Sequence, residues 1–263
     1  MWETTVKGRQ LHFHLAGINN QNFIMRDEET GTYWQQITGA AIAGPLKGSH
    51  LTLLPQDELT FTLWKQEQPK GMVLAPVSKY ASKYEKATWE AEIGKLPTVI
   101  HATKGTLPDR ETILGVVING SAKAFQVTKL TTQTPVLLDV VAGEPIMLVL
   151  GPDGKSIRVF SRQIGTQTLD FYGSTAVPPV AQNATQSAPQ LASQPASPSG
   201  TPPTTQSANP WKLIDGATAT EWAFDGCAVS GEMKGQCLRR IEALKDYWFD
   251  WQHYHPDSAI FQH

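Results

Sequence analysis

Two stretches of the chain carry the same pattern of residues, and this repetition limits the folds that the chain can adopt. An aspartate is followed at fixed spacing by two threonines and a tryptophan, as D-x-x-T-x-T-x-W, at 27–34 and again at 215–222. After a slip of one residue, 39–74 aligns without a gap on 226–261, with eight identities in 36 positions. Most of the identical residues are glycine, tryptophan or proline, whose backbone or volume other residues rarely replace. We therefore predict an internal duplication.

The repeated unit has the composition and the local patterns of a β-rich fold. The 263 residues include 21 Gly and 18 Pro, and 40% are hydrophobic, so turns are frequent and a core can form. A short helix is predicted in each copy, at about 56–67 and about 244–254, and each is ended by a proline. Trp64 and Trp251, one on each helix, are expected in the core. The other elements predicted in the first copy are strands at 11–15, 23–25, 51–54 and 72–74, with a turn at 44–48.

These patterns predict a mainly β protein, of the α+β kind with few short helices, in which two related β-rich units form a pseudo-twofold body. Hairpins are predicted around Asn119-Gly120 and Pro152-Asp153-Gly154. Residues 174–210 contain eight prolines and no charged residue, which predicts a disordered insertion. The predicted division is 1–75 for the first repeat unit, 76–110 for a connector, 111–173 with 211–263 for the second repeat unit, and 174–210 for the insertion.

The duplicated pattern supplies the candidate ligand-binding residues, and two interpretations of it are open. An aspartate followed three residues later by a threonine commonly closes a turn, in which case the tryptophan fills the core. Alternatively, the aspartate and tryptophan line a cleft between the copies and hold a sugar or another small polar ligand. The residues concerned are Asp27, Thr30, Trp34, Asp215, Thr218 and Trp222.

Two histidines supply a candidate metal site. His12 and His14 are two apart on a predicted strand, so both imidazoles project from one face. Such a pair can bind copper or zinc if a third ligand comes from elsewhere, and His50, His101 and Asp27 are candidates. The favoured alternative is a pair of solvent-facing histidines. His253 and His255, at the end of the second predicted helix, are assigned a structural or surface position, since a helix C-terminus favours protonated histidine.

Cys227 and Cys237 are the two cysteines of the chain, and they flank the predicted hairpin end 231–235. They could face each other across this hairpin. Two reduced thiols are the favoured interpretation, and one disulfide is the alternative.

Longer motifs resemble a known bacterial family. They are D-E-E-T-G-T-Y-W-Q-Q-I-T-G-A-A-I-A-G-P-L-K-G at 27–48, L-L-D-V-V-A-G-E-P-I at 137–146, V-F-S-R at 159–162 and Y-W-F-D-W-Q-H-Y-H-P-D at 247–257. In these motifs the chain resembles DUF3179, a bacterial domain of unknown function, over most of its length apart from the insertion. The resemblance implies an exported protein of the periplasm or cell envelope, although the first residues do not read as a secretory signal. It implies no activity.

The net charge and the absence of known enzyme motifs exclude several classes of function. The net charge of −2 and the pI near 6.4 give no basic footprint, so we expect no nucleic-acid partner. No apolar run approaches the roughly 20 residues that span a bilayer. The signatures G-x-S-x-G, H-E-x-x-H, P-loop and G-x-G-x-x-G are absent from the sequence. We expect a non-catalytic ligand-binding or structural module of the bacterial envelope, with a small polar ligand or a protein as partner. A metal-dependent enzyme or metal carrier is the alternative, and the oligomeric state is open.

Overall fold

The computed structural model of the chain describes all residues except 20–21, 55, 85, 87, 103–106, 176–210 and 263. The predicted disordered insertion therefore lies, apart from its first two residues, outside the described residues. Strands dominate the described part, as the sequence predicts, and they form several separate sheets, in which the pairing is antiparallel except between β8 (Ser121–Gln126) and β19 (Ala259–Ile260). The mainly β class with few short helices is confirmed.

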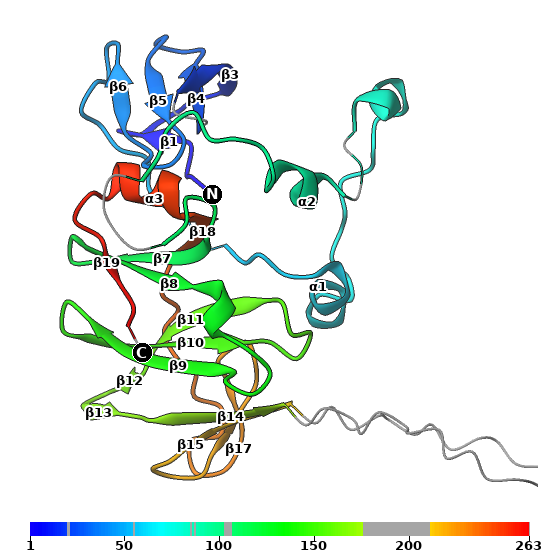
Figure 1. Cartoon of the computed structure of the whole chain (residues 1–263), viewed down its shortest axis with the longest axis vertical. Coiled ribbons are helices and arrows are strands. Elements are labelled where there is room, and N and C mark those ends of the chain that lie inside the picture. The colour runs from blue at the N-terminus through cyan, green and yellow to red at the C-terminus, as the bar shows by residue number, and fades with distance from the viewer. Residues whose placement is uncertain are drawn as a thin grey trace, which may run out of the picture.

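Two four-stranded sheets lie at opposite ends of the molecule (Figure 1). We call them the N-terminal sheet and the C-terminal sheet. The N-terminal sheet consists of β3 (Phe13–Asn19), β4 (Asn22–Asp27), β5 (Tyr33–Gln35) and β6 (Ala41–Ala43), and the hairpin of β1 (Thr5–Val6) and β2 (Arg9–Gln10) precedes it. The C-terminal sheet consists of β14 (Phe171–Thr175), β15 (Trp211–Asp215), β16 (Glu221–Trp222) and β17 (Ala228–Ser230), and the hairpin of β12 (Gln163–Ile164) and β13 (Gln167–Thr168) precedes it.

The strand order of these two sheets matches, and so does their register, apart from a bulge between Leu15 and Gly17 that the C-terminal sheet lacks. In each, the second strand ends on the aspartate, which pairs with a phenylalanine of the first strand: Phe13 with Asp27, and Phe171 with Asp215. Each sheet has a register shift directly before its tryptophan. Two isolated bridges also correspond, since Trp2–Leu53 and Ala40–His50 in the first half have the counterparts Phe160–Arg240 and Cys227–Cys237 in the second. The residues spaced alike in the sequence therefore occupy equivalent strand positions.

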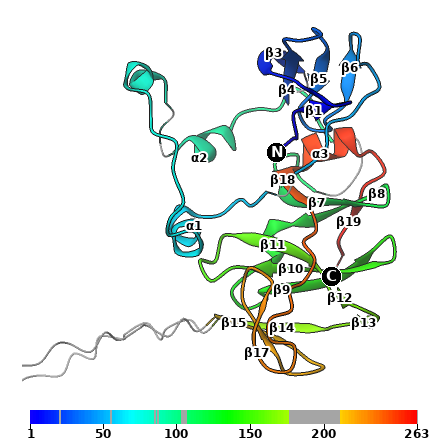
Figure 2. The same cartoon turned by 180° about the vertical axis from the view of Figure 1, so that it is seen from behind.

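Two further sheets lie between the ends (Figures 1 and 2). One has the order β18-β7-β8-β19, from Ala243–Tyr247, Thr112–Ile118, Ser121–Gln126 and Ala259–Ile260; the other has the order β11-β10-β9, from Ile157–Ser161, Glu144–Leu150 and Val136–Val141. The predicted hairpins are confirmed. Asn119 and Gly120 both have positive φ, 48° and 78°, as a type I′ turn requires.

Alternate side chains of strand β10 enter two different parts of the hydrophobic core. Met147 and Val149 pack with Trp222 and its neighbours on the C-terminal sheet, whereas Ile146 and Leu148 pack with residues of β7 and β8. Both faces of β10 are therefore buried, which explains its continuous apolar sequence. The N-terminal sheet has a separate small core around Trp34.

The helices differ from the predicted ones at their starts. Helix α1 is Phe61–Glu67, because the hydroxyl oxygen of Thr60 accepts the backbone N–H of Leu63 and caps it there. Helix α3 is Trp248–Tyr254, and the residues before it form β18, which pairs with β7. The remaining helices are α2 (Trp89–Ile93) and the 3₁₀ helices η1 (Ser78–Lys83) and η2 (Val127–Lys129).

Two expectations for the first helix region are wrong. Residues 72–74 form no strand, and Met72 and Leu74 are 93% and 97% exposed. Trp64 is half-buried rather than in the core, because α1 does not pack on the N-terminal sheet: Leu63 enters the core of the C-terminal half instead. Trp251 is buried, as predicted. Within the described residues, no helix is both long and apolar enough to cross a membrane.

Candidate ligand-binding cavity

The residues of each Asp-Thr-Trp set come together within their own sheet, and the two sets do not meet, because the sheets lie at opposite ends of the molecule. A carboxylate oxygen of Asp27 accepts the backbone N–H of Thr30 at 2.5 Å, and the other accepts the indole N–H of Trp34 at 2.8 Å. Asp215 accepts from the backbone of Thr218 at 2.7 Å and from the indole of Trp222 at 3.0 Å. Burial raises the pKa of both carboxyls, but these hydrogen bonds outweigh burial and lower it.

These contacts give each of the six residues a structural role: the aspartates and threonines close turns, and the tryptophans fill the core. Both aspartates are 1% exposed, and both tryptophans are at most 2% exposed. Each indole also meets a phenylalanine edge to face: Phe13 lies 5.9 Å from Trp34, and Phe171 lies 5.6 Å from Trp222. The ligand-binding interpretation stays a prediction, and the hydrogen bonds favour the turn-closing alternative.

The two histidines of the predicted metal site pair with glutamates instead. Nδ1 of His12 lies 2.6 Å from Glu29 Oε1, and Nδ1 of His14 lies 4.0 Å from Glu28 Oε1. The hydrogen bond to Glu29 raises the pKa of His12. Of the predicted third ligands, Asp27 bonds within its own turn and His101 pairs with Asp109. Within the described residues, no group of three or more His, Cys, Asp or Glu side chains is arranged to hold a metal ion.

The cysteines form a disulfide, so the favoured expectation of two reduced thiols is wrong. Cys227 and Cys237 are direct partners across two antiparallel segments, and their side chains therefore project to the same side. The equivalent positions of the N-terminal sheet hold Ala40 and His50.

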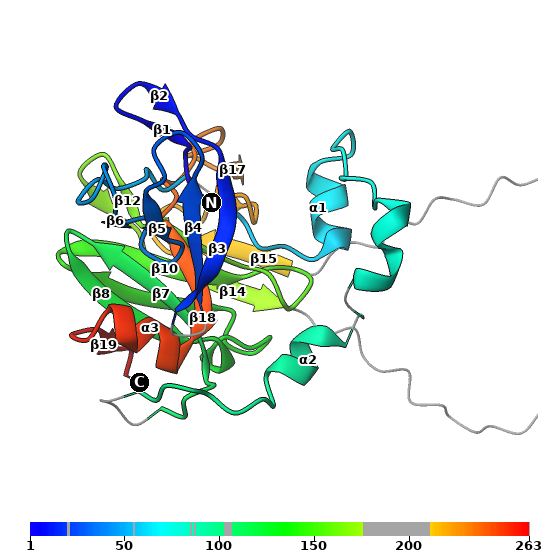
Figure 3. The ribbon, with the colours of Figure 1, turned by 90° about the horizontal axis from the view of Figure 1, so that it is seen from above.

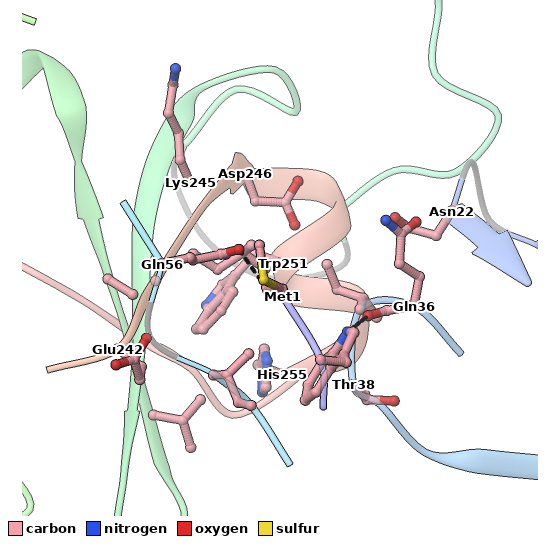
Figure 4. Close-up of a pocket in the computed structure, with 17 residues that line it drawn as sticks. Met1, Asn22, Gln36, Thr38, Gln56, Glu242, Lys245, Asp246, Trp251 and His255 are labelled. Carbon is pink, nitrogen blue, oxygen red and sulfur yellow. Dashed lines mark hydrogen bonds between the residues drawn. The ribbon is translucent and has the colours of Figure 1, made fainter. Parts of the chain in front are cut away.

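A cavity of about 780 Å³ lies between the N-terminal sheet and the layer formed by β7, β18 and α3 (Figure 4). Asn22, Gln36 and Thr38 line it from the N-terminal sheet and the turn after β5, and Asp246 and His255 line it from the opposite layer. Apolar parts of the wall come from Leu53, Val117, Leu244 and Trp251. A second cavity, of about 730 Å³, lies on the other side of Asn22 and Asp246, below the segment that carries α2.

Asp246 is the central group of the wall, because it lines both cavities. It lies at the end of β18, and Asp250 lies four residues further, in the first turn of α3. Oδ1 of Asp246 accepts the backbone N–H of Tyr247 at 2.7 Å, while the buried Oδ2 accepts no hydrogen bond from the described residues. The side-chain amide of Asn22 donates to both oxygens of Asp250, at 2.6 and 2.5 Å.

Ionising both Asp246 and Asp250 at once is unfavourable. Burial, followed by the nearby charge of Asp250, raises the pKa of Asp246 to about 8. Burial also raises the pKa of Asp250, but the amide of Asn22 and a hydrogen bond with Asp246 oppose this shift. We assign the charge to Asp250, since its oxygens have the amide donor, and the proton to Asp246. At neutral pH Asp246 is therefore a neutral acid, whose proton can be donated either to Asp250 or to a ligand in the cavity.

The other ionisable groups around the first cavity are partnered or neutral. The amino group of Met1 donates to Oε1 of Gln56 at 2.5 Å and interacts with Glu242, which also lines the cavity. Burial lowers the pKa of His255, so its ring is neutral at pH 7, and it stacks at 4.0 Å on Trp251. The ammonium group of Lys245 pairs with Glu58. The cavity thus presents amides, a hydroxyl and a neutral acid beside apolar side chains.

The sequence analysis did not identify this site. Asp250 belongs to the motif Y-W-F-D-W, and Asp246 directly precedes it. On the predicted helix at about 244–254 these two carboxyls, four residues apart, would lie on one face, which is a signal that the sequence does contain. Asn22 and Gln36 reach the site only through the packing of the N-terminal sheet on α3, which no local pattern reveals.

Comparison with known proteins identifies the family to which the chain belongs. The description of the matching family is "Protein of unknown function (DUF3179)", and the match covers residues 1–258. No curated protein and no solved structure is significantly similar to the chain. Because the match extends over nearly all of the 263 residues, the chain belongs to the DUF3179 family.

Proposed function

We propose that this protein is a non-catalytic binding module that holds a small uncharged polar ligand in the cavity beside Asp246. The observation that carries the proposal is a cavity of about 780 Å³ that is lined by Asp246, a residue whose buried carboxyl oxygen Oδ2 accepts no hydrogen bond from the described residues. A cavity of this size is typical of sites for small molecules. A buried polar group gains from a partner that a ligand supplies.

The chemistry of the wall selects the ligand class. The side-chain amide of Gln36 offers donors and an acceptor, and Leu53 and Leu244 offer apolar surface. Asn22 adds its amide oxygen and Thr38 its hydroxyl oxygen as acceptors, since the amide N–H groups of Asn22 donate to Asp250 and the hydroxyl of Thr38 donates to Gln35.

The charged groups of the wall balance one another: the amino group of Met1 interacts with Glu242, and Lys245 pairs with Glu58. The wall therefore favours no net charge on the ligand, and a charged ligand would lose its hydration without a matching gain. A neutral sugar or an N-acylated amino sugar has the matching combination of hydroxyl, amide and apolar groups.

Calorimetric titration with N-acetylglucosamine and glucose, and with glucuronate as the charged counterpart, tests this function. We expect the neutral sugars to bind and glucuronate not to bind. In Asp246→Asn, the amide replaces the neutral acid as donor, so binding is retained. Asp246→Ala lacks a donor, and we expect about tenfold weaker binding. Glu232→Gln, in an exposed loop of the C-terminal sheet, is the control. Equal affinity of wild type and Asp246→Ala, or saturation by neither neutral sugar, would contradict the proposal.

We also propose that the protein acts outside the cytoplasm, in the bacterial envelope. A disulfide such as Cys227–Cys237 persists in oxidising compartments and is rare where thiols are kept reduced. Cell fractionation of the source bacterium, with thiol labelling of the recovered protein, tests the location. Recovery from the cytoplasm with two free thiols would contradict it.

We infer that the N-terminal and C-terminal sheets derive from one duplicated unit. Their equal strand order, their register, which is equal apart from the bulge in β3, and the corresponding isolated bridges support this inference. On this proposal, 1–75 is the first unit, 111–173 with 211–263 is the second, 76–110 connects them, and 174–210 is a disordered insertion in the second. Mild proteolysis tests the insertion, since it should be cleaved before either sheet.

A further inference from the structure

Residues 68–84, which we call the arm, leave the body of the molecule directly after α1 (Figure 3). Every residue of the arm is exposed. The arm nevertheless carries the two most exposed large apolar side chains of the described residues, Met72 at 93% and Leu74 at 97%, with Val73 at 63% between them. Val77, Tyr80 and Tyr84 are also large and between 42% and 50% exposed. An apolar surface of this kind marks a docking site.

The arm is held in shape by its own contacts. Helix η1 spans Ser78–Lys83, and the hydroxyl of Tyr84 accepts the backbone N–H of Val77 at 2.7 Å, which closes this turn. At the start of the arm, the Cα of Gly71 lies so close to the indole of Trp64 that a Cβ there would be 2.5 Å from the ring. The arm is thus anchored to α1.

The charge of the arm indicates what it docks on. It contains three lysines, Lys70, Lys79 and Lys83, and no acidic residue. The ammonium groups of Lys79 and Lys83 lie 4.8 and 5.7 Å from the centre of the Tyr80 ring. Lysines beside tyrosines and long aliphatic side chains suit the interface of a bilayer, where rings lie at the level of the headgroups and ammonium groups meet anionic lipid.

We propose that the arm binds the surface of a bilayer that contains anionic lipid. Met72, Val73 and Leu74 enter the boundary between headgroups and acyl chains, and the lysines pair with lipid phosphates. The binding is peripheral and reversible, because one short apolar segment and three positive charges give only moderate affinity. The inference is independent of the cavity beside Asp246, since no arm residue lines it.

Co-sedimentation of the full chain with vesicles tests the proposal. Vesicles of phosphatidylcholine alone are compared with vesicles that also contain phosphatidylglycerol. We expect binding to the mixed vesicles only, and loss of that binding when salt rises from about 0.1 M to about 1 M. The doubly substituted variants Met72→Ser with Leu74→Ser, and Lys79→Glu with Lys83→Glu, should each bind about tenfold more weakly or worse.

The matched control reverses two exposed lysines outside the arm, Lys47→Glu with Lys234→Glu, which produce the same net charge. Its binding should equal that of the wild type. Thermal unfolding verifies that the variants fold, which we expect because all substituted side chains are exposed. The proposal is overturned by no binding to either vesicle, by equal binding to both, or by equal loss in the control. It is also overturned if the arm variants abolish self-association of the chain but leave vesicle binding unchanged.

Discussion

The proton on Asp246 is the residue-scale feature on which the proposed function depends. Asp246 and Asp250 lie four residues apart, and only Asp250 has a side-chain donor, the amide of Asn22. The fold thus separates the two carboxyls into a charged one and a neutral one. A neutral carboxyl is the one form of this side chain that can donate a hydrogen bond to a ligand.

The same carboxyl makes stability depend on pH. The pKa of Asp246 rises from an ordinary value of 3.8 to about 8 on folding, so the folded state binds one more proton than the unfolded state between these values. The free energy of unfolding therefore falls as pH rises from about 4 to about 8, by at most about 1.4 kcal/mol per pH unit. Asp246→Asn has no such proton to lose. Urea unfolding at pH 5, 7 and 9 should show a steeper decline for the wild type, and equal slopes would contradict the assignment. Glu232→Gln should behave as the wild type.

The two Asp-Thr-Trp sets predict matched losses of stability. In Asp27→Asn or Asp215→Asn, one of the two acceptor oxygens becomes a donor that faces an N–H group. We expect each variant to lose about 1–3 kcal/mol of unfolding free energy. If the sets only close turns, binding of N-acetylglucosamine to the folded variants is unchanged. Loss of that binding at full stability would instead favour the ligand-binding interpretation.

The sequence predicted residues whose partners are near in the chain and missed those whose partners are distant. Asp27 and Trp34 are seven apart, so their spacing alone indicated a common turn. Asn22 and Asp250 are 228 apart, and their contact depends on how the N-terminal sheet packs on α3. A same-face histidine pair was predictable for the same local reason, but Glu29, which pairs with His12, lies 17 residues away in the sequence.

At the scale of elements, the matching bridges of the two sheets suggest an engineered disulfide. Ala40 and His50 form the same isolated antiparallel bridge as Cys227 and Cys237. Side chains at such positions project to the same side, which is the arrangement that the native disulfide uses. We expect Ala40→Cys with His50→Cys to oxidise spontaneously and to stabilise the N-terminal sheet by up to about 3 kcal/mol.

Mass spectrometry of the unreduced variant, and unfolding with and without reductant, measure this effect. The double variant Cys227→Ala with Cys237→Ala should lose a similar free energy, because it opens a loop of equal length. Two free thiols at 40 and 50 after oxidation would show that the two sheets differ in geometry at this bridge.

Strands could be predicted from the sequence where the turn between them has a characteristic residue pair. Asn119-Gly120 determines both positive φ angles of the β7–β8 hairpin, so strands on either side followed. The start of α3 was not predictable from periodicity, because Leu244 and Trp248 are spaced as on a helix, yet 243–247 pairs with β7. Residues 243–247 are a strand because they pair with β7, which lies more than 100 residues away in the sequence.

At the scale of the whole molecule, α1 belongs to the other half of the chain. The segment 56–67 follows the N-terminal sheet in sequence, but Leu63 packs in the core of the C-terminal half. Asp57 and Glu67 lie on either side of the helix, and both bind Arg158 of β11. The sequence alignment treats 56–67 as part of the first unit, and spacing within one segment cannot reveal which body a helix packs on.

Arg158 is therefore the residue that we expect to hold α1 and the arm to the body. Its guanidinium is 4% exposed, it donates to Asp57 and Glu67 at 2.6 and 2.7 Å, and it lies 4.6 Å above the ring of Phe224. Arg158→Met keeps much of the volume but leaves both carboxylates without this cation. We expect a loss of about 3 kcal/mol in unfolding free energy, since removing one member of a buried ion pair is strongly destabilising.

The same substitution should expose the arm to protease before the fold is lost. Trypsin cleaves after lysine, and Lys65 and Lys70 lie at the junction that Arg158 secures. Cleavage there should be faster in Arg158→Met than in the wild type under conditions where both are folded. Arg239→Met removes an exposed pair with Glu144, in which the arginine is 61% exposed, and should cost less than about 1 kcal/mol without accelerating cleavage. Equal cleavage rates in all three proteins would mean that apolar packing around Leu63, rather than the buried arginine, holds the segment in place.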